Sequence, residues 1–436
     1  MAPWKWILVK ELKIMDSSQH HDDKSITEIA EDLLTRRYGG TQKLQDPVEL
    51  SGSGHARVIR ARVTSSPFLP HRTVILKQSP RTGDLVEDAA FLREVASYQF
   101  TTSLAEEFRP GPVILAHDCN SRLIVLSDSG DGDTFADLLE ESDPEKRVQI
   151  LRALGTSLGR MHSGTAGKEE AFNILLSRLG RNDENAHRFQ EIRERLLELG
   201  FAVGLDIIRN AGIEVPREAS ETMPTIQRRL RQGRYRAFTP FDLSPDNIIV
   251  ADRTEFLDYE WAGFRDVSFD LACVIAGFPQ YISLQPISDD EAAAFTEAWL
   301  HEVDELWPGL TNEDVLHERI TIALVGWAFS SVTLMYYGSL ANIISSHAAA
   351  RDYLEITTED LDRLGINPDR SSETNTNLLK PANDVDFTED ELLVRRDLYE
   401  TFEALGRFAA AGRNSSYSVL SEFAFHVAEI LNDARL

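Results

Sequence analysis

One segment in the middle of the chain carries residues of the types that bind divalent metals and move protons. Asp242 and Asn247 stand five positions apart in Phe-Asp-Leu-Ser-Pro-Asp-Asn, a composition typical of a tight turn. An apolar run, residues 248–250, leaves this turn, and a second short strand returns to Asp258. A β-hairpin of this layout brings Asp258 back beside the turn. Oxygens of Asp and Asn are the ligands that Mg²⁺ takes in proteins, usually together with phosphate oxygens and water.

These residues also offer a candidate for a general base. Transfer of a phosphoryl group to a hydroxyl requires one carboxylate that is not used by the metal and that orients the hydroxyl and accepts its proton. Asp242 is the candidate for this base, while Asn247 and Asp258 are the candidates for the metal. Taken alone, Asp242 and Asn247 are also common turn formers, so a purely structural role remains open on these residues by themselves.

The sequence around this turn resembles that of the aminoglycoside phosphotransferase and choline kinase-like family, which are small-molecule kinases with a protein-kinase-like fold. The family's catalytic loop has the form His-Gly-Asp-x-x-x-x-Asn, and this chain has Asp242 and Asn247 at that spacing. The run Asp258-Tyr-Glu-Trp-Ala-Gly resembles the family's Asp-aromatic-Glu-x-Ala-Gly segment, and Asp270-Leu-Ala resembles the opening of its next helix. The chain lacks Asp-Phe-Gly with a long activation loop, which separates it from protein kinases.

The resemblance implies a role for each of these acids. It makes Asp242 the catalytic base and Asn247 and Asp258 the ligands of Mg²⁺. It gives Asp266 and Asp270 structural roles, with Asp270 expected to cap the N-terminus of the following helix and to brace the catalytic loop. It also implies ATP, or GTP, as co-substrate and a small-molecule hydroxyl as phosphate acceptor.

The match has one departure, at the two residues before the catalytic Asp. The family has His-Gly there, whereas this chain has Pro240-Phe241. The family's His mainly organises the backbone, so its replacement does not by itself abolish transfer. The departure keeps a second function open, that of a pseudokinase or nucleotide-binding scaffold that has retained the fold and lost turnover.

The resemblance also implies a nucleotide-binding lobe before the catalytic loop. A glycine turn, a lysine at the end of a strand (residues 73–77) and a glutamate on the next helix occur in the expected order. Lys77 is expected to contact the α- and β-phosphates and Glu94 to orient Lys77 through an ion pair. The strand at residues 123–126 resembles the hinge whose backbone binds adenine. The expected ATP-binding residues are Gly52, Ser53, Gly54, Lys77, Glu94, Leu126, Ser127 and Asp128.

The pattern of elements predicts an α+β protein of two lobes, a small antiparallel β-sheet followed by a mainly helical lobe. Short β-like runs occupy residues 48–78 and 123–126, and amphipathic helical spacing begins at residue 147. We expect an N-terminal tail and helix (1–44), an N-lobe that binds nucleotide (45–128), a helical C-lobe with the catalytic loop and acceptor site (129–364), a polar loop or linker (365–387) and C-terminal helices that pack on the C-lobe (388–436).

Composition bounds the partners. The formal net charge of −26 argues against nucleic acid, since binding to phosphate backbones needs clustered Lys and Arg. The same field would concentrate a cationic acceptor such as an amine or amino sugar, although broad acidity is commonly a matter of solubility. Amines, amino sugars, sugars and antibiotics all remain open, because acceptor specificity depends on pocket side chains that the family pattern does not fix.

The chain is expected to be a cytoplasmic protein without a membrane span. Its two cysteines, Cys119 and Cys273, are too few and too far apart for a disulfide framework. The N-terminal apolar patch is interrupted by Lys5 and followed by further charges, so no signal peptide is expected. The longest uncharged stretch, residues 320–344, contains several polar residues and is expected to be a buried core helix.

Overall fold

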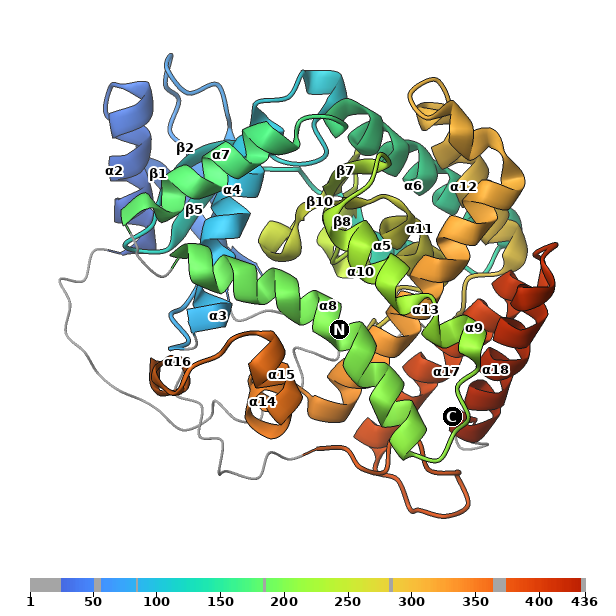
Figure 1. Ribbon diagram of the computed structural model, residues 1–436. Helices are drawn as coiled ribbons and strands as arrows, with labels where there is room; N and C mark the ends of the chain where they lie inside the picture. The colour runs from blue at the N-terminus through green and yellow to red at the C-terminus, as the bar shows by residue number, and fades with distance from the viewer. Residues whose placement is uncertain are drawn as a thin grey trace.

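The computed structural model describes residues 25–50, 56–83, 85–182, 186–281, 285–363 and 374–432. The predicted glycine turn, Gly52-Ser53-Gly54, and the tail that precedes residue 25 lie outside the described residues. Figure 1 shows a smaller lobe with the β-sheet, drawn in blue, beside a larger lobe that is mainly helical. The predicted two-lobed α+β architecture is confirmed.

The smaller lobe is built on an antiparallel sheet with the strand order β1-β2-β3-β5-β4. Because successive side chains of a strand point to opposite faces, Val74 and Leu76 of β3 lie on one face and Ile75 and Lys77 on the other. Val74 and Leu76 pack with Leu34 of helix α2, whereas Ile75 packs into the main core. The strands are β1 (Leu44–Leu50), β2 (Arg57–Val63), β3 (Thr73–Gln78), β4 (Ile114–Asp118) and β5 (Leu123–Ser127).

Three helices complete this lobe. Helix α2 (Ile26–Tyr38) begins with a capping box, in which Ser25 and Glu28 exchange side-chain to backbone hydrogen bonds. The helical segment after β3 is divided at Ala89 into α3 (Leu85–Asp88) and α4 (Ala90–Thr102). Helix α4 is buried along most of its length, including the charged side chains of its second turn. It therefore carries charges into the interior, where each needs a partner.

The larger lobe contains fourteen described α-helices, and two of them cross at very close range. A Cβ atom added at Gly204 of α8 would lie 1.9 Å from the carbonyl oxygen of Phe329 in α13, so a glycine is required at this crossing. The helices are α5 (Phe135–Leu139), α6 (Pro144–Thr165), α7 (Glu169–Leu179), α8 (Ala186–Asn210), α9 (Arg217–Ser220), α10 (Met223–Arg231), α11 (Ser268–Ile275), α12 (Asp289–Val303), α13 (Glu313–Tyr337), α14 (Leu340–Ser346), α15 (Ala348–Tyr353), α16 (Thr358–Arg363), α17 (Glu389–Ala410) and α18 (Ser415–Leu431).

Helix α13 is the apolar helix that the sequence predicts to be buried. By length and composition it could cross a membrane, but 83% of its most apolar 18-residue window is buried inside the protein. It packs against α8, α11 and α17. The helix ends at Gly338, which adopts the left-handed conformation that favours glycine at a helix C-terminus (φ 71°). The predicted buried core helix is confirmed, and it ends seven residues before the end of the uncharged stretch.

Two small antiparallel sheets pack on α5, α6 and α10 of the larger lobe and support the segment that contains Asp242. Strand β7 (Arg236–Thr239) pairs with β10 (Gly263–Asp266). Strand β8 (Ile248–Val250) pairs with β9 (Thr254–Phe256) and with the short β6 (Asp133–Thr134). The β8–β9 pair is the hairpin expected after Asn247, so this part of the sequence prediction is confirmed.

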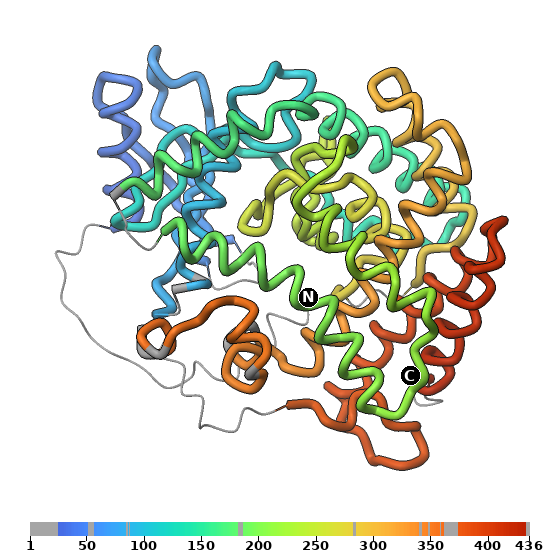
Figure 2. Tube along the Cα trace, in the orientation of Figure 1, coloured from blue at the N-terminus to red at the C-terminus, as the bar shows by residue number. Residues whose placement is uncertain are grey.

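The C-terminal part of the chain differs in one respect from the prediction. Figure 2 shows α17 and α18 as a red pair beside the orange α13. The expected polar surface loop, however, packs in its described portion: Leu378 and Leu379 are buried. The buried Arg395 of α17 donates hydrogen bonds to the carbonyl oxygens of Leu378 and Lys380. A buried arginine that binds backbone thus anchors a segment whose composition indicated a loop.

Candidate active site

Asp242 lies in the loop that connects β7 to β8. The residue before it, Phe241, has a φ of 64°, a left-handed conformation that is strained for a bulky side chain. The Ser244 N–H donates to Asp242 Oδ1 at 3.3 Å, and the Asn247 N–H donates to the Ser244 carbonyl at 2.8 Å. Pro245 opens the short 3₁₀ turn that ends at Asn247. The loop is therefore a chain of local hydrogen bonds that holds Asp242 and Asn247 on one turn.

The β8–β9 hairpin brings Asp258 back to this turn. The N–H of Leu257 donates to the carbonyl of Asn247 at 2.8 Å, which joins the two ends of the hairpin. Asp258 follows directly and adopts the left-handed conformation (φ 60°, ψ 64°) that Asp tolerates better than most residues. Its N–H is directed at the hydroxyl of Tyr98 on α4, at 3.3 Å. The backbone segments that carry Asn247 and Asp258 are therefore adjacent.

Lys77 connects this segment to the smaller lobe. Its ammonium lies 2.6 Å from Glu94 Oε1 on α4 and 2.8 Å from Asp258 Oδ1. The strand alternation that directs Lys77 toward α4 places its Nζ between a carboxylate of each lobe. The predicted Lys77–Glu94 ion pair is present. The additional pair with Asp258 was not expected. We call Lys77, Glu94 and Asp258 the lysine cluster.

Burial and charge act on the lysine cluster in opposite directions. Burial disfavours the ammonium of Lys77, but the carboxylates of Asp258 and Glu94 outweigh it and raise the pKa of Lys77 well above its ordinary value. Burial raises the pKa of Glu94, against the attraction of Lys77. The cluster holds two carboxylates and one ammonium, so it carries an excess of negative charge that favours a cation.

One cavity of about 240 Å³ brings the predicted residues together. Its walls include five of the residues to which the sequence assigns catalytic, metal-binding or phosphate-linked roles. The rest of the wall comes from the smaller lobe, including Ser79, Phe91 and Arg122, and from α8, α13, α14 and the loop after α11. The five residues are Lys77, Glu94, Asp242, Asn247 and Asp258.

The donor atoms near this cavity suit a magnesium ion. Asn247 and Asp258 offer an amide oxygen and a carboxylate oxygen, which are hard ligands. Among the described residues, no group of three or more His, Cys, Asp and Glu side chains is arranged to hold a metal. A site built from one or two protein oxygens, completed by phosphate oxygens and water, is the usual arrangement for Mg²⁺ in enzymes that act on nucleotides.

The predicted hinge residues lie at the end of β5 and directly after it. Strand β5 is paired on both sides, with β3 and with β4, so Leu126 lies within the sheet. The Ser127 N–H donates to the Val113 carbonyl at 2.9 Å. The Asp128 carboxylate binds the Arg60 guanidinium, with 2.9 Å between Oδ2 and Nε. None of the three predicted residues is among those that line the described cavity.

The expected N-cap role of Asp270 is wrong. Helix α11 begins at Ser268, so Asp270 lies inside its first turn. The residue that binds the start of the helix is Asp266, whose Oδ1 accepts from the Ser268 N–H at 3.1 Å and from the Ser268 hydroxyl at 2.6 Å. Asp270 Oδ2 instead lies 3.1 Å from His162 Nε2 on α6, and both side chains are fully buried. Asp270 braces α11 against α6.

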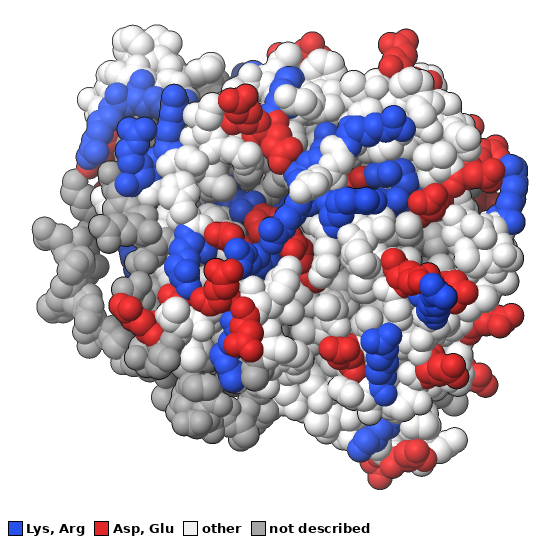
Figure 3. All heavy atoms as spheres, viewed as in Figure 1, with Lys and Arg blue, Asp and Glu red and all other residues white. Residues whose placement is uncertain are grey.

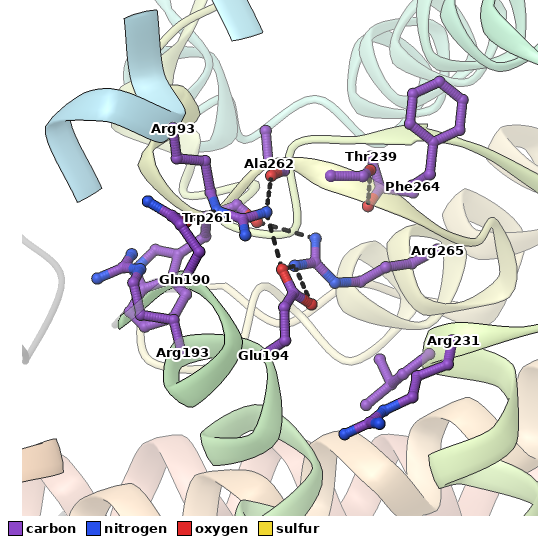
Figure 4. A network of polar contacts seen from close by, with 12 residues as sticks. Arg93, Gln190, Arg193, Glu194, Arg231, Thr239, Trp261, Ala262, Phe264 and Arg265 are labelled. Atoms are coloured by element: carbon purple, nitrogen blue, oxygen red, sulfur yellow. Dashed lines mark hydrogen bonds and ion pairs between the residues drawn. The ribbon is translucent and has the colours of Figure 1, made fainter. Parts of the chain in front are cut away.

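A second group of charges, which sequence reasoning missed, adjoins the lysine cluster. Figure 4 shows Arg93 and Arg265, which come from different elements, both pointing toward Glu194 of α8. Arg93 Nη1 lies 2.8 Å from Glu194 Oε1, and Arg265 Nη2 lies 2.8 Å and 3.0 Å from its two oxygens. We call Arg93, Glu194 and Arg265 the arginine cluster. Its residues are far apart in sequence, so no local motif indicates it.

The arginine cluster also holds the segment after Asp258. Arg93 donates to the carbonyl of Ala262 at 2.9 Å, and Arg265 donates to the carbonyl of Trp261 at 2.8 Å. Burial opposes the charge of Glu194, but the guanidinium groups of Arg265 and Arg93 outweigh it and lower the pKa of Glu194 to about 2. Burial lowers the pKa of Arg93 to about 10, so it stays charged at neutral pH.

The loop after α11 forms another wall of the cavity and is held by the C-terminal helices. Gly277, Phe278 and Gln280 all have positive φ, at 79°, 61° and 74°. The Gln280 N–H donates to both carboxylate oxygens of Asp397 on α17, at 2.9 Å and 3.0 Å. Burial raises the pKa of Asp397 well above its ordinary value. Asp397 was not singled out from the sequence, where it is one of many acids on an amphipathic helix.

A family model described as the phosphotransferase enzyme family matches residues 60–310, more than half of the chain. Similar solved structures include the GDP complex of aminoglycoside 2′-phosphotransferase-IIIa (10% identity, TM-score 0.41, covering 78% of this chain and 97% of that one). A choline kinase from Cryptosporidium parvum Iowa II has 12% identity and a TM-score of 0.41, with 78% and 98% of the two chains covered. A fructosamine-3-kinase described as putative, from Thermobifida fusca, has 14% identity and a TM-score of 0.39, with 79% and 99% covered.

No curated protein matches the chain significantly. The solved structures are too distant to indicate a substrate, so the assignment rests on the family model. That match runs from β2 to the short turn before α13 and includes the lysine cluster and the loop with Asp242. The chain belongs to the phosphotransferase enzyme family and has its two-lobed, protein-kinase-like fold.

Proposed function

We propose that this phosphotransferase is a magnesium-dependent kinase that moves the γ-phosphoryl group of ATP, or GTP, to a hydroxyl of a small molecule. The observation that carries the proposal is the position of Lys77, bound to Glu94 and Asp258 in the same cavity as Asp242 and Asn247. A lysine that is held by a carboxylate from each lobe can contact nucleotide phosphates. Asp242, which is not bound to Lys77, can contact the acceptor hydroxyl.

Each residue of the site has a proposed task. Lys77 binds the α- and β-phosphates, and Glu94 fixes the direction of its ammonium. Asn247 and Asp258 hold Mg²⁺, which when bound neutralises charge on the phosphate oxygens. Asp242 orients the acceptor hydroxyl and accepts its proton. A bond then forms between the acceptor oxygen and the γ-phosphorus while the bond to the bridging oxygen breaks, and the nucleoside diphosphate leaves.

The rest of the nucleotide site is proposed from the family resemblance. The backbone of Gly52, Ser53 and Gly54 would approach the phosphates. Because Leu126 is paired on both sides and the Ser127 N–H is already bonded, the backbone that contacts the base is assigned to the stretch that begins at Asp128. Of the three expected hinge residues, this proposal therefore keeps Asp128 as the contact with the base.

One observation favours a second candidate, a nucleotide-binding scaffold without turnover. Pro240 and Phe241 replace the family's His-Gly, and Phe241 holds a left-handed conformation that a glycine would adopt without strain. The loop nevertheless forms the hydrogen bonds that hold Asp242 and Asn247 on one turn. Turnover distinguishes the two candidates.

The test measures transfer of labelled phosphate from ATP, with and without Mg²⁺, across a panel of alcohols, sugars, amino sugars and amines. The wild type is compared with Asp242→Asn and with Asp252→Asn, which removes the same charge from an exposed turn of the β8–β9 hairpin. We expect Asp242→Asn to lose about 10²–10⁴ in rate, the usual contribution of a general base, and Asp252→Asn to match the wild type. Nucleotide binding without any transfer would favour the scaffold.

A further inference from the structure

The cavity that contains Asp242 is walled mainly by carbon. Phe241 precedes Asp242 directly and packs on Trp327 of α13, with 5.3 Å between ring centroids and 29° between planes. The Trp327 Nε1–H donates to the Phe269 carbonyl at 2.8 Å, so its polar atom is already bonded. Apolar residues that line the cavity include Leu196, Phe241, Trp261, Phe278, Trp327 and Ile343.

The aromatic rings of this wall already hold positive charges of the protein itself. The Arg265 Cζ atom lies 4.5 Å from the centroid of Phe241, and the Arg193 Cζ atom lies 3.8 Å from the centroid of Trp261. Figure 4 shows Arg193 beside Trp261. Aromatic faces attract cations through their quadrupole, and here guanidinium groups occupy two of them. A cationic acceptor on this wall would therefore meet like charge.

Few carboxylates of the cavity are available to pair with a positive charge on the acceptor. Four of the described lining residues are acidic, and two of them, Glu94 and Asp258, are bound to Lys77. Of the other two, Asp242 faces the reacting hydroxyl in the proposed function, which leaves Glu260. A buried ammonium group needs a partner of opposite charge, so an acceptor with several amino groups could not be neutralised by these residues.

The net charge of the chain does not change this local balance. The arginine cluster beside the wall contains two guanidinium groups and one carboxylate. Figure 3 shows Lys and Arg side chains interspersed with Asp and Glu on the face viewed as in Figure 1. The charge of −26 acts at long range, whereas the affinity of the acceptor site depends on the groups that touch the acceptor.

We propose that the acceptor is a compact, uncharged alcohol whose hydroxyl is attached to an apolar ring or branched chain. The proposal rests on the proposed kinase function and names its substrate class. Pockets for drug-sized ligands usually span about 300–1,000 Å³, and this cavity of about 240 Å³ also includes the space beside Lys77. The cationic acceptor that the net charge suggested is therefore not what the wall favours.

The test uses two probes of the same shape that differ in one charge. Choline carries a trimethylammonium group, and 3,3-dimethylbutan-1-ol carries a tert-butyl group in its place. We expect kcat/KM for phosphate transfer from ATP to be at least about tenfold higher for the uncharged alcohol, and kanamycin to be a poor acceptor. Equal or better transfer to choline or kanamycin would overturn the proposal.

A second measurement separates this proposal from the kinase function. Saturation-transfer NMR with the full-length protein and MgADP reports binding of the methyl groups that both probes share, without any turnover. Stronger saturation of 3,3-dimethylbutan-1-ol supports the proposed acceptor class even if no phosphate is transferred, in which case the kinase function fails alone. Stronger saturation of choline, or none of either probe, would overturn the acceptor class.

A pair of variants tests the charge argument directly. Ser330 of α13 lines the cavity and is 9% exposed. Ser330→Asp adds a carboxylate to the wall and should move the preference at least tenfold toward choline, whereas Ser330→Asn, of the same size, should leave the preference for the uncharged alcohol. If both variants keep the same ratio as the wild type, the charge of the wall does not select the acceptor.

Discussion

Two consecutive residues of α4 enter ion clusters of opposite character. Glu94 belongs to the lysine cluster, in which two carboxylates share one ammonium, and this cluster faces the cavity. Arg93 belongs to the arginine cluster, in which two guanidinium groups share the carboxylate of Glu194. In the lysine cluster, the excess negative charge lies beside the cavity. In the arginine cluster, further N–H groups of both guanidinium groups donate to backbone carbonyls.

We infer from this difference that the lysine cluster binds ligands and that the arginine cluster stabilises the structure around it. The lysine cluster has negative charge that a metal ion and phosphates can share. In the arginine cluster, the hydrogen bonds of Arg265 end on Glu194 and on the carbonyl of Trp261, three residues after Asp258. Helix α8 thereby ties α4 of the smaller lobe to the segment that follows Asp258. Substitutions in the first cluster should affect rate, and those in the second should affect stability.

The largest expected effect is on catalysis, at Lys77. Lys77→Met should lower kcat/KM about 10²–10³-fold, the usual effect of removing one group that stabilises developing charge. Lys43→Met, which removes a surface lysine paired with Glu31, is the matched control and should keep full rate. A fully active Lys77→Met enzyme would contradict the proposed phosphate contact.

The second effect is on folding, at Arg265. The Arg265 side chain is 1% exposed, so Arg265→Met removes a buried guanidinium from the partly exposed Glu194 and leaves the Trp261 carbonyl without its donor. We expect a loss of about 3 kcal/mol in the free energy of unfolding, the low end for buried pairs because Glu194 keeps Arg93. Arg62→Met, which removes an exposed pair with Asp46, should cost about 0–1 kcal/mol. Urea unfolding measures both, and equal losses would show that the arginine cluster does not support the fold.

The third effect is a pH dependence at Glu194. Its pKa of about 2 in the folded protein lies below the ordinary 4.5, so its contribution to stability is present above pH 4.5 and is lost as the pH falls toward 2. Glu194→Gln should be less stable than the wild type at pH 7, and this difference should narrow between about pH 4.5 and 2. Glu191→Gln, an exposed i,i+4 partner of Arg195 on the same helix, should show little dependence on pH. A difference that is constant from pH 7 to 3 would contradict the assigned shift.

The sequence predicted the parts of the site that local motifs encode. The hairpin between Asn247 and Asp258 follows from a turn and two short strands, and the Lys77–Glu94 pair follows from the family order of strand and helix. Both depend on spacing that the sequence shows directly. The two-lobed fold follows from the change of hydrophobic period along the chain.

The remaining parts depend on contacts between distant segments. Glu194 is one of many acids on an amphipathic helix, and nothing in its spacing indicates that Arg265 will meet it. The cap expected of Asp270 failed because α11 begins at Ser268, where Asp266 accepts the bonds instead. The conformation of Phe241 did have a signal, since the family glycine at this position indicates a left-handed backbone.

The smallest expected effect is a difference in stability between two variants of Phe241, which connects the arginine cluster to the loop that contains Asp242. The ring of Phe241 contacts both the guanidinium of Arg265 and the indole of Trp327, but we infer that the hydrogen bonds of the loop, and not these ring contacts, impose the strained φ of 64°. Replacing the ring should cost about 3–5 kcal/mol in either small variant. Because alanine keeps the left-handed strain and glycine does not, Phe241→Gly should be more stable than Phe241→Ala by about 1 kcal/mol.

The control for Phe241 reverses this order. At Leu393, an exposed position within α17, the glycine variant should be less stable than the alanine variant by about 1 kcal/mol, as in any helix. Chemical unfolding of the four variants gives both differences. If alanine is the more stable replacement at both positions, the backbone at Phe241 relaxes once the ring is removed. The left-handed conformation before Asp242 would then be set by Arg265 and Trp327 through the ring, and not by the loop itself.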